Sequence, residues 1–117
     1  MPLLYIKFGK ERIPIHRNDI LYIAAHNKHS IIYLKDSKEI ESTDSLKLIS
    51  TQLEEPRFYR THGSFVINCS CIKSFNTHHV TLNGDIKVSI SRNKRKSFET
   101  NLSIYNNKIK EESITPK

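Results

Sequence analysis

Short hydrophobic stretches separated by polar corners run through most of the chain. Many alternate between apolar and polar residues, and the stretch at 20–23 is continuously apolar. Runs of this length bounded by Gly, Pro, Asn, Asp and Ser are typical of β-strands. The strands predicted on this basis cover 5–8, 12–16, 20–23, 30–34, 39–42, 65–67, 72–75, 79–82 and 85–88. The pattern therefore predicts a mostly antiparallel β fold.

The segments between these runs carry turn residues. Gly9 and Lys10 are expected to connect the first two strands, and residues 35–38 a later pair. Asn83 and Gly84 form the dipeptide that most strongly indicates a tight β-hairpin. Residues 24–29 are expected to form a polar loop with several hydrogen-bond donors, less mobile than a glycine-rich linker.

Two helices are expected in addition. The first begins near Asp44, whose carboxylate can accept hydrogen bonds from the open backbone N–H groups of a first turn. Its buried stripe is Leu46, Ile49 and Leu53. The sequence at 54–56, Glu-Glu-Pro, is expected to end it, because the residue before a proline is driven out of the helical region.

The second helix is predicted to begin after Ser91, which is a favourable N-cap residue. One of its faces is expected to pack on the sheet and carries Phe98, Leu102, Tyr105 and Ile109. The opposite face carries Lys94, Asn101 and Lys108. The fold class predicted is thus mostly β with two helices, one in mid-chain and one at the C-terminal end.

A chain of 117 residues without an internal repeat is expected to form one domain with its own core. We place that domain at 1–110 and expect the polar segment 111–117 to be a frayed, disordered tail. No apolar run approaches the roughly 18 residues that span a bilayer, and residues 1–6 do not resemble a signal peptide. We therefore expect a cytoplasmic protein that contacts no membrane.

Positive charge is in excess and is unevenly distributed. The net charge is +7 at pH 7, which favours a polyanionic partner. The densest group of cations lies within residues 87–96 and consists of Lys87, Arg92, Lys94, Arg95 and Lys96. Such a cluster is typical of an edge that faces phosphates, although it also fits the solvated start of a helix.

The sequence contains no recognisable active site. It has no Gly-rich phosphate loop and no His-Glu-x-x-His motif. Ser64 and His62 are too close in sequence to form a nucleophile and base with a third orienting group. Cys69 and Cys71 match no common zinc site, so we expect reduced packing residues, no metal and no cofactor.

The stretch at 58–75 joins an aromatic pair, a polar corner and two short apolar strands. Arg60, His62 and Ser64 lie at the corner, where a rigid base would hold their hydrogen-bonding groups in fixed directions. His62 has two interpretations: it contacts a ligand, or it lies in the core and bonds to a backbone carbonyl. Asn68 is expected to cap the end of the strand.

Three separated segments together resemble the LytTR family of bacterial DNA-binding domains. The central motif of that family reads Phe-x-Arg-x-His-x-Ser-Phe/Tyr-x-Val/Ile-Asn, followed by Ile. The matching residues are Phe58, Arg60, His62, Ser64, Phe65, Ile67, Asn68 and Ile72. The run at 19–23 resembles an early strand of the family, and residues 83–84 with 88–92 resemble its Asn-Gly … Ser-Arg ending. The resemblance covers about 5–98 and implies layered antiparallel sheets of short strands.

The resemblance also implies roles for individual residues in binding double-stranded DNA through loops. It places His29, or its neighbour Lys28, at a base edge in one major groove and Arg92 at a guanine in another. The residues expected to contact or position the sugar-phosphate backbone are Asn27, Lys28, Arg60, His62, Gly63, Ser64, Asn93, Lys94, Arg95 and Lys96. An exposed loop histidine and a surface ion pair are the alternative interpretations of His29 and Arg92.

Two positions depart from the family pattern. Gly63 stands where many members carry Asn, Arg or Lys, so no side chain reaches a base from there. This predicts weaker or altered reading of the intervening base pairs. Ala24 stands where an acidic residue is common.

The family further implies binding to paired direct repeats, with the protein monomeric when free and two copies on the DNA. It also implies a receiver domain in the full-length chain of a response regulator. Two other classes stay open on the sequence alone: a basic β-rich RNA-binding module, and a protein-interaction domain with incidental positive charge. An RNA module would stack bases on exposed aromatic rings, whereas the aromatic residues here are expected to be buried.

Overall fold

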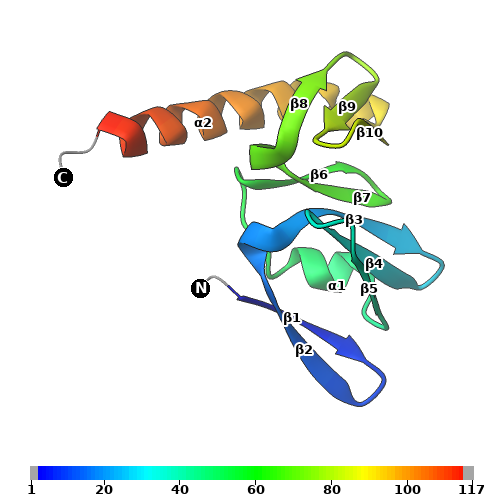
Figure 1. Ribbon diagram of the computed structural model, residues 1–117. Helices are drawn as coiled ribbons and strands as arrows, with labels where there is room; N and C mark the ends of the chain where they lie inside the picture. Colours follow the sequence, from blue (N-terminus) through cyan, green and yellow to red (C-terminus); the bar gives the residue numbers. More distant parts are fainter. Residues whose placement is uncertain (1–2, 115–117) are drawn as a thin grey trace.

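The computed structural model describes residues 3–114, with side chains described up to residue 110, and consists of antiparallel sheets and helices (Figure 1). Its strands are β1 (Leu3–Phe8), β2 (Glu11–His16), β3 (Ile20–His26), β4 (His29–Leu34), β5 (Glu39–Ser42), β6 (Phe58–His62), β7 (Phe65–Asn68), β8 (Ile72–Phe75), β9 (His79–Leu82) and β10 (Ile86–Ser89). The α-helices are α1 (Leu46–Ser50) and α2 (Arg95–Ile114), and the 3-10 turns are η1 (Arg17–Asp19), η2 (Cys69–Cys71) and η3 (Arg92–Lys94). The predicted fold class, mostly β with two helices, is confirmed.

The strands form three layers, which Figure 1 shows stacked from bottom to top. β1 and β2 form a two-stranded sheet, the middle sheet has the order β5-β4-β3-β7-β6, and the third has the order β10-β9-β8. Every pairing of strands is antiparallel. α1 packs against the middle sheet, and α2 crosses the upper part of the molecule beside β6.

The middle sheet separates two hydrophobic cores, and this explains why its central strands are so apolar. Phe58 and Val66 point into the lower core with β1, β2 and α1. Their neighbours Tyr59 and Ile67 point into the upper core with β9, β10 and α2. Successive side chains of a strand alternate between faces, so a strand that is covered on both sides is apolar throughout.

The β1–β2 hairpin is attached to the middle sheet through polar contacts at its edge. The backbone oxygen of Lys7 accepts hydrogen bonds from the Thr43 N–H at 2.8 Å and from the Ser42 hydroxyl at 2.8 Å. The Gln52 side chain bonds both to the N–H and to the oxygen of Tyr5, at 3.1 and 2.7 Å. These contacts place the hairpin under the middle sheet, away from the third one.

Two connections differ from the prediction in length. The polar loop expected at 24–29 is shorter, because Ala24, Ala25 and His26 continue β3 and only Asn27 and Lys28 form the turn. Conversely, the hairpin at Asn83 has a three-residue turn at 83–85, since Leu82 pairs with Ile86. The left-handed conformation that such turns need occurs at Asn27 (φ 58°), Gly84 (φ 85°) and Asp85 (φ 62°).

The first helix is shorter than expected and begins one residue later. Ser45 is its N-cap, and its hydroxyl accepts a hydrogen bond from the Leu48 N–H at 3.2 Å. The Asp44 carboxylate, which was expected to cap the helix, accepts instead from the N–H of Lys7 at 3.0 Å. The helix ends at Ser50, before the proline, because residues 51–53 bond three residues back rather than four.

The second helix also differs from the prediction at both ends. Ser91 precedes the 3-10 turn η3, and its hydroxyl donates to the Asn93 amide oxygen rather than accepting from a backbone N–H. Burial along the expected inner face decreases from Phe98, which is 1% exposed, to Ile109, which is 44% exposed. α2 continues to Ile114, four residues past the expected end of the domain at 110, and the rest of the expected tail, 115–117, lies outside the described residues.

Asn101 was expected on the outer face of this helix, and that expectation is wrong. The residue is only 6% exposed, and its side-chain amide donates to the backbone oxygen of Pro56 at 2.9 Å. The contact joins α2 to the segment before β6. A helical wheel cannot reveal this burial, because a loop rather than a strand covers that part of α2.

Both cysteines are buried and free of disulfide bonds. Within the described part of the chain, no group of three or more metal-ligating side chains occurs. Asn68 caps the turn that contains them, as expected: its side-chain amide oxygen accepts from the Ser70 N–H at 3.0 Å. Among residues 3–114, no helix is both long and apolar enough to cross a lipid bilayer.

Candidate nucleic-acid interface

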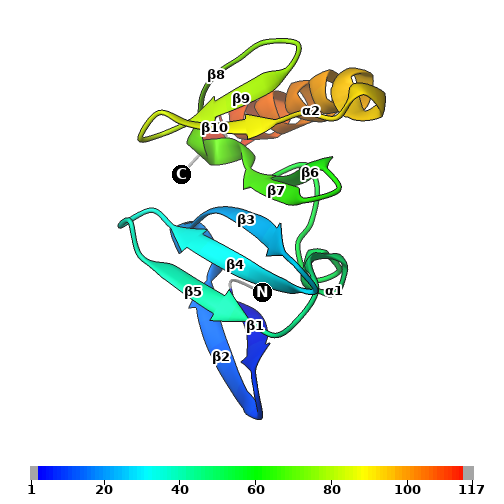
Figure 2. The same ribbon diagram turned by 90° about the vertical axis from the view of Figure 1, so that its right-hand side faces the viewer.

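Three tips of the fold lie on the same side of the molecule. They are the β3–β4 tip (residues 26–29), the β6–β7 tip (residues 62–64) and the α2 start (residues 91–96), and together we call them the tip surface. Figure 1 shows all three at its right-hand side, and in Figure 2, where that side faces the viewer, they lie one above another. The two loops that the resemblance places in separate grooves therefore lie on one surface of the protein.

The β6–β7 tip holds the other two in position through backbone hydrogen bonds. The Ala25 N–H of β3 donates to the backbone oxygen of Ser64 at 2.8 Å. The Ser91 N–H, one residue before η3, donates to the backbone oxygen of Thr61 in β6 at 2.8 Å. Because both bonds are between backbone groups of ordered strands, the spacing of the three tips is set by the sheet itself.

The β3–β4 tip presents the first candidate residues for base contact. His29 is exposed, as are Asn27 and Lys28 in the turn. His26 pairs directly with His29 across the hairpin, so both imidazoles stand on the same face of it. The sequence interpretation treated His26 only as part of a loop; the two-residue turn, and hence the pairing, becomes visible only with the strand register.

At the β6–β7 tip, most polar groups bond to one another. The Arg60 guanidinium donates to the backbone oxygen of Gly63 at 2.8 Å. The His62 Nδ1 accepts from the Ser64 N–H at 3.0 Å, and the His62 ring lies 5.6 Å from the Phe65 ring. His62 is half-buried and its Nδ1 accepts from a backbone N–H, so neither the core location nor the bond to a backbone carbonyl considered for it is found. This network makes the tip rigid.

Gly63 itself stands free in space. An added Cβ would meet no atom within 4 Å, and the backbone is outside the left-handed region. Neither the available space nor the backbone conformation therefore requires a glycine at position 63. Its lack of a side chain leaves the centre of the tip surface without a donor.

The α2 start carries the densest charge, but its cations do not form one patch. Arg92 and Asn93, in η3, and Lys96, in the first turn of α2, are exposed. Lys94 is half-buried, with its ammonium 6.0 Å from the centre of the Tyr59 ring. Arg95 is half-buried on the other flank of α2, where it lines a small hollow with Phe75, Phe98 and Glu99. Arg95 thus points away from Lys94 and Lys96.

Tyr59 supports the α2 start from below. Its hydroxyl is hydrogen-bonded to the Ser97 hydroxyl, and its ring contacts that of Phe98 with the centroids 5.9 Å apart. It is only 3% exposed, and it also lies under the Lys94 ammonium. Sequence reasoning placed it in an aromatic pair without a role. A role for Tyr59 could have been predicted only by knowing that its side chain faces the upper core, under the α2 start.

The charge of the tip surface is free to act on a partner. The salt bridges of the described residues join Lys38 to Asp36 and Lys73 to Asp85, both away from the three tips. Within that same part of the chain, no candidate cation of the tip surface forms a salt bridge, so the ion pair considered for Arg92 is absent. Unpaired cations on one convex edge attract a polyanion without the cost of breaking internal pairs.

The exposed aromatic rings do not form a stacking platform. Tyr5 and Phe8, on β1, and Phe75, on β8, are between 43% and 47% exposed, which corrects the expectation that all aromatic residues are buried. Tyr5 and Phe8 are three residues apart on one strand and point to opposite faces. Phe75 packs edge-on against Phe98 at 5.5 Å. Single-stranded RNA modules stack successive bases on neighbouring rings, and these three are not neighbours.

Comparison with known proteins gives one family. Residues 10–103 match the family described as the LytTr DNA-binding domain. The accessory gene regulator protein A of Staphylococcus epidermidis is 36% identical over 73 residues, which are 62% of this chain and 30% of that protein. The protein of the same name from Staphylococcus aureus is 34% identical over the same length and with the same coverage. The chain thus spans about 30% of the length of these relatives.

A solved structure confirms the architecture. The LytTr DNA-binding domain of a putative methyl-accepting/DNA response regulator from Bacillus cereus superposes with a TM-score of 0.72. The match covers 87% of this chain and 97% of the other, at 20% sequence identity. At that identity the similarity concerns the fold: the sheets, the helices and the tips that they position.

Proposed function

Because the chain belongs to the LytTR family of DNA-binding domains, we propose that it binds double-stranded DNA sequence-specifically through the tip surface. The observation that carries this proposal is the common direction of the three tips (Figure 2), tied together by the bonds from Ala25 to Ser64 and from Ser91 to Thr61. In this arrangement the β3–β4 tip enters one major groove and the α2 start another. The β6–β7 tip lies against the backbone between them.

His29 and Arg92 have the base-reading roles in this proposal. Both are exposed at the ends of their tips, and neither is paired within the described residues. A guanidinium donates in a plane to O6 and N7 of guanine, and an imidazole either donates to or accepts from a base edge. The register supports His29 over Lys28, since His29 begins β4 and shares a face with His26, whereas Lys28 lies in the turn.

The backbone contacts are divided between the other residues. Asn27, Lys28, Asn93 and Lys96 are exposed and supply donors to phosphates on either side of the bases. Arg60 and His62 contribute mainly by making the central tip rigid, through their bonds to Gly63 and Ser64. Lys94 retains a phosphate role, because it is half-buried and lines the same hollow as the exposed Lys96. Arg95 contributes least, because it faces the other flank of α2.

We further propose that two copies bind paired direct repeats and that the domain is the DNA-binding part of a response regulator with a receiver domain. The support for the second statement is the origin of the matching structure, a domain of a response regulator. The support for the first is the membership of the LytTR family, which implies paired direct repeats.

Footprinting on the DNA upstream of the protein's own gene tests the function. We expect protection of two short segments with the same orientation, one helical turn or a multiple of it apart. Protection without sequence preference, or of a single segment at saturation, would contradict the repeat proposal. Binding to a structured RNA in preference to every duplex would overturn the function itself.

A further inference from the structure

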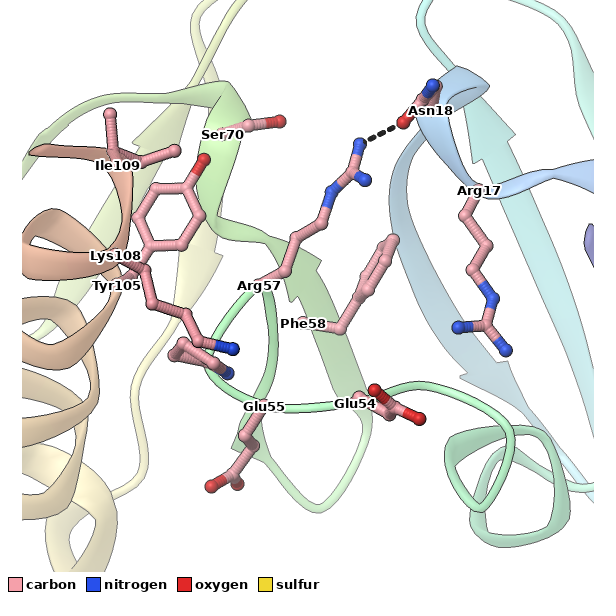
Figure 3. A pocket seen from close by; sticks show the side chains of 11 residues that line it. Arg17, Asn18, Glu54, Glu55, Arg57, Phe58, Ser70, Tyr105, Lys108 and Ile109 are labelled. Atoms are coloured by element: carbon pink, nitrogen blue, oxygen red, sulfur yellow. Dashed lines mark hydrogen bonds between the residues drawn. The ribbon is translucent and has the colours of Figure 1, made fainter. Parts of the chain in front are cut away.

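A hollow of about 600 Å³ lies on the side of the molecule opposite the tip surface. It opens between α2, the segment before β6 and the turn η1, which Figure 1 shows at the left. Figure 3 shows the side chains that surround it. Its size is that of a site for a small molecule, whereas a stable protein partner needs a broad surface of about 800 Å².

One wall of the hollow does not belong to the part of the chain that defines the family. The match to the family covers residues 10–103, and Tyr105, Lys108 and Ile109 lie beyond it on α2. Their spacing places the three on one face of the helix. Tyr105 is half-buried and Ile109 is 44% exposed, so together they form an apolar wall that a ligand can cover. One wall of the hollow thus lies outside the residues that match the family, and the hollow is on the side of the molecule away from the tip surface.

Cationic groups also line the hollow, one of them, Lys108, on the wall itself. The Arg57 guanidinium donates to the side-chain oxygen of Asn18 and lies 5.6 Å from the centre of the Phe58 ring. These two contacts hold it in one orientation, and its other N–H groups stay available to a ligand. The Lys108 ammonium has no hydrogen bond or salt bridge to any described residue. The Nε of Arg17, at the far side, is buried without a partner in the same part of the chain.

The two acidic residues of the hollow lie at its rim. Glu54 and Glu55 are exposed. Figure 3 shows their carboxylates at the lower edge, away from the Tyr105 hydroxyl and the Arg57 guanidinium. The groups that meet in the interior are therefore a guanidinium, a phenol and the hydroxyl of Ser70, next to an apolar helix face.

We propose that this hollow binds a small organic anion, with its carboxylate or phosphate on the Arg57 guanidinium, its apolar body against Tyr105 and Ile109, and the Lys108 ammonium adding positive charge at the edge of the hollow. A guanidinium that is already oriented binds such groups with two parallel hydrogen bonds, and a nearby ammonium adds charge. The walls come from both cores, since Phe58 belongs to the lower one and Tyr105 packs on the upper one. A ligand here bridges the two halves of the molecule and stabilises their arrangement.

Phenyl phosphate is a suitable probe, and the binding is measured without DNA. We expect a saturable titration in two-dimensional amide NMR, with shifts at Tyr105 and Arg57, and a rise in the melting temperature. Benzyl alcohol has the ring without the charge, so it tests whether the anionic group is needed. Inorganic phosphate has the charge without the ring, so it tests whether the apolar body is needed. Both are expected to bind at least about fivefold more weakly, since charge-assisted bonds and one buried ring each contribute on this scale.

The variant Lys108→Gln is expected to weaken phenyl phosphate by about five- to tenfold, because it removes one charged partner at an exposed position. Lys47→Gln, on the exposed face of α1, removes the same charge elsewhere and is expected to leave the affinity unchanged. Arg57→Gln is expected to weaken binding further, and its melting temperature reports whether its contacts with Asn18 and Phe58 were needed for folding.

Three results would overturn the proposal. One is the absence of saturable binding up to about 10 mM phenyl phosphate. Another is equal binding of phenyl phosphate and inorganic phosphate. The third is loss of binding in Lys96→Gln but not in Lys108→Gln, which would place the probe on the tip surface. None of these results would contradict DNA binding, which is tested separately with duplexes at the tip surface on the opposite side of the molecule.

Discussion

Arg92 and Lys96 lie one helical turn apart in the chain but in different local structures, and this difference predicts different roles. Arg92 is in the exposed 3-10 turn η3, at the end of the tip, whereas Lys96 is on the first turn of α2. A residue at the end of a tip reaches the base edges in a groove. A residue on the flank of the helix meets the phosphates beside it.

We expect Arg92→Ala to abolish most of the preference for the cognate repeat, a loss of about 1–3 kcal/mol, while weak nonspecific binding persists. Lys96→Ala is expected to weaken binding to every duplex by a similar factor. Fluorescence anisotropy with a cognate and a scrambled duplex of the same length measures both. Equal losses on the two duplexes for both variants would show that the division of roles is wrong.

Cys69 predicts a dependence of stability on pH. Burial, with smaller contributions from Glu55 and Cys71, raises the pKa of the Cys69 thiol from 9.0 to about 12. The folded protein thus keeps a proton that the unfolded chain loses above pH 9. The contribution is complete below pH 9 and is lost as the pH rises from 9 to about 12.

Over that range we expect the free energy of unfolding of the natural protein to fall faster than that of Cys69→Ala, by up to about 1.4 kcal/mol per pH unit. Urea unfolding at pH 8 and pH 10 measures the difference. The two proteins differ only at position 69, so the comparison isolates the thiol. Parallel pH profiles would mean that the thiolate is accommodated in the core.

At the scale of elements, the β6–β7 hairpin is the part on which the DNA-binding surface depends. It pairs with β3 on one side and hydrogen-bonds to the segment before η3 on the other. Its two strands also supply residues to both cores. A change at its tip therefore acts on recognition, whereas a change in its strands acts on stability.

Gly63 at that tip allows a direct test. There is room for a side chain, and replacing glycine at a compatible position reduces the freedom of the unfolded chain, so Gly63→Asn is expected to stabilise the protein by about 0.4–1 kcal/mol. The asparagine also supplies a donor and an acceptor between the two groove-reading tips. We expect a new sequence preference at the base pairs that lie between the groove contacted by the β3–β4 tip and the groove contacted by the α2 start of the same copy.

Thermal unfolding measures the change in stability. The change in preference is measured by selection from a DNA library that is randomised at the base pairs between the two grooves contacted by one copy. Gly63→Ala is the matched control, because it adds a Cβ without a hydrogen-bonding group and should raise stability without changing the selected sequence. If Gly63→Asn selects the same sequences as Gly63→Ala, the β6–β7 tip does not face the bases.

At the scale of the whole molecule, net charge and shape combine. The chain carries +7, and the three tips that hold the candidate cations lie on one side of the molecule (Figure 2). Association with DNA then releases condensed counterions in proportion to the phosphates that are neutralised. The charge on other surfaces contributes to long-range attraction but not to these contacts.

With about five phosphates contacted, the logarithm of the affinity should fall against the logarithm of salt concentration with a slope of about −4 to −5. Titrations between about 50 and 200 mM salt determine this slope. Lys96→Ala should reduce it by about one. A flat profile would remove DNA as the partner and favour a protein-interaction domain with incidental charge.

Local pattern was sufficient for nine of the ten strands and for the family. The strand β6 (Phe58–His62) was not predicted, because its residues were interpreted as an aromatic pair and a polar corner, although the motif at 58–72 placed Arg60, His62 and Asn68 in known register. The predictions for Asp44 and Asn101 were wrong because a segment distant in the sequence contacts each of these side chains. Asp44 was expected to cap α1, but Lys7 brings its N–H to the carboxylate from β1. Asn101 was expected in solvent, but the loop at Pro56 covers it.

The sequence by itself determined most of the strands, where the charge is concentrated and to which family the chain belongs, because these depend on neighbours along the chain. Only the tertiary structure decided that the tips of β3–β4, β6–β7 and α2 share one side, and that Arg95 turns away from Lys94 and Lys96. It alone revealed the hollow between Arg57 and Lys108. These features join residues far apart in the chain, and their relative positions follow from how two cores pack on either side of one sheet.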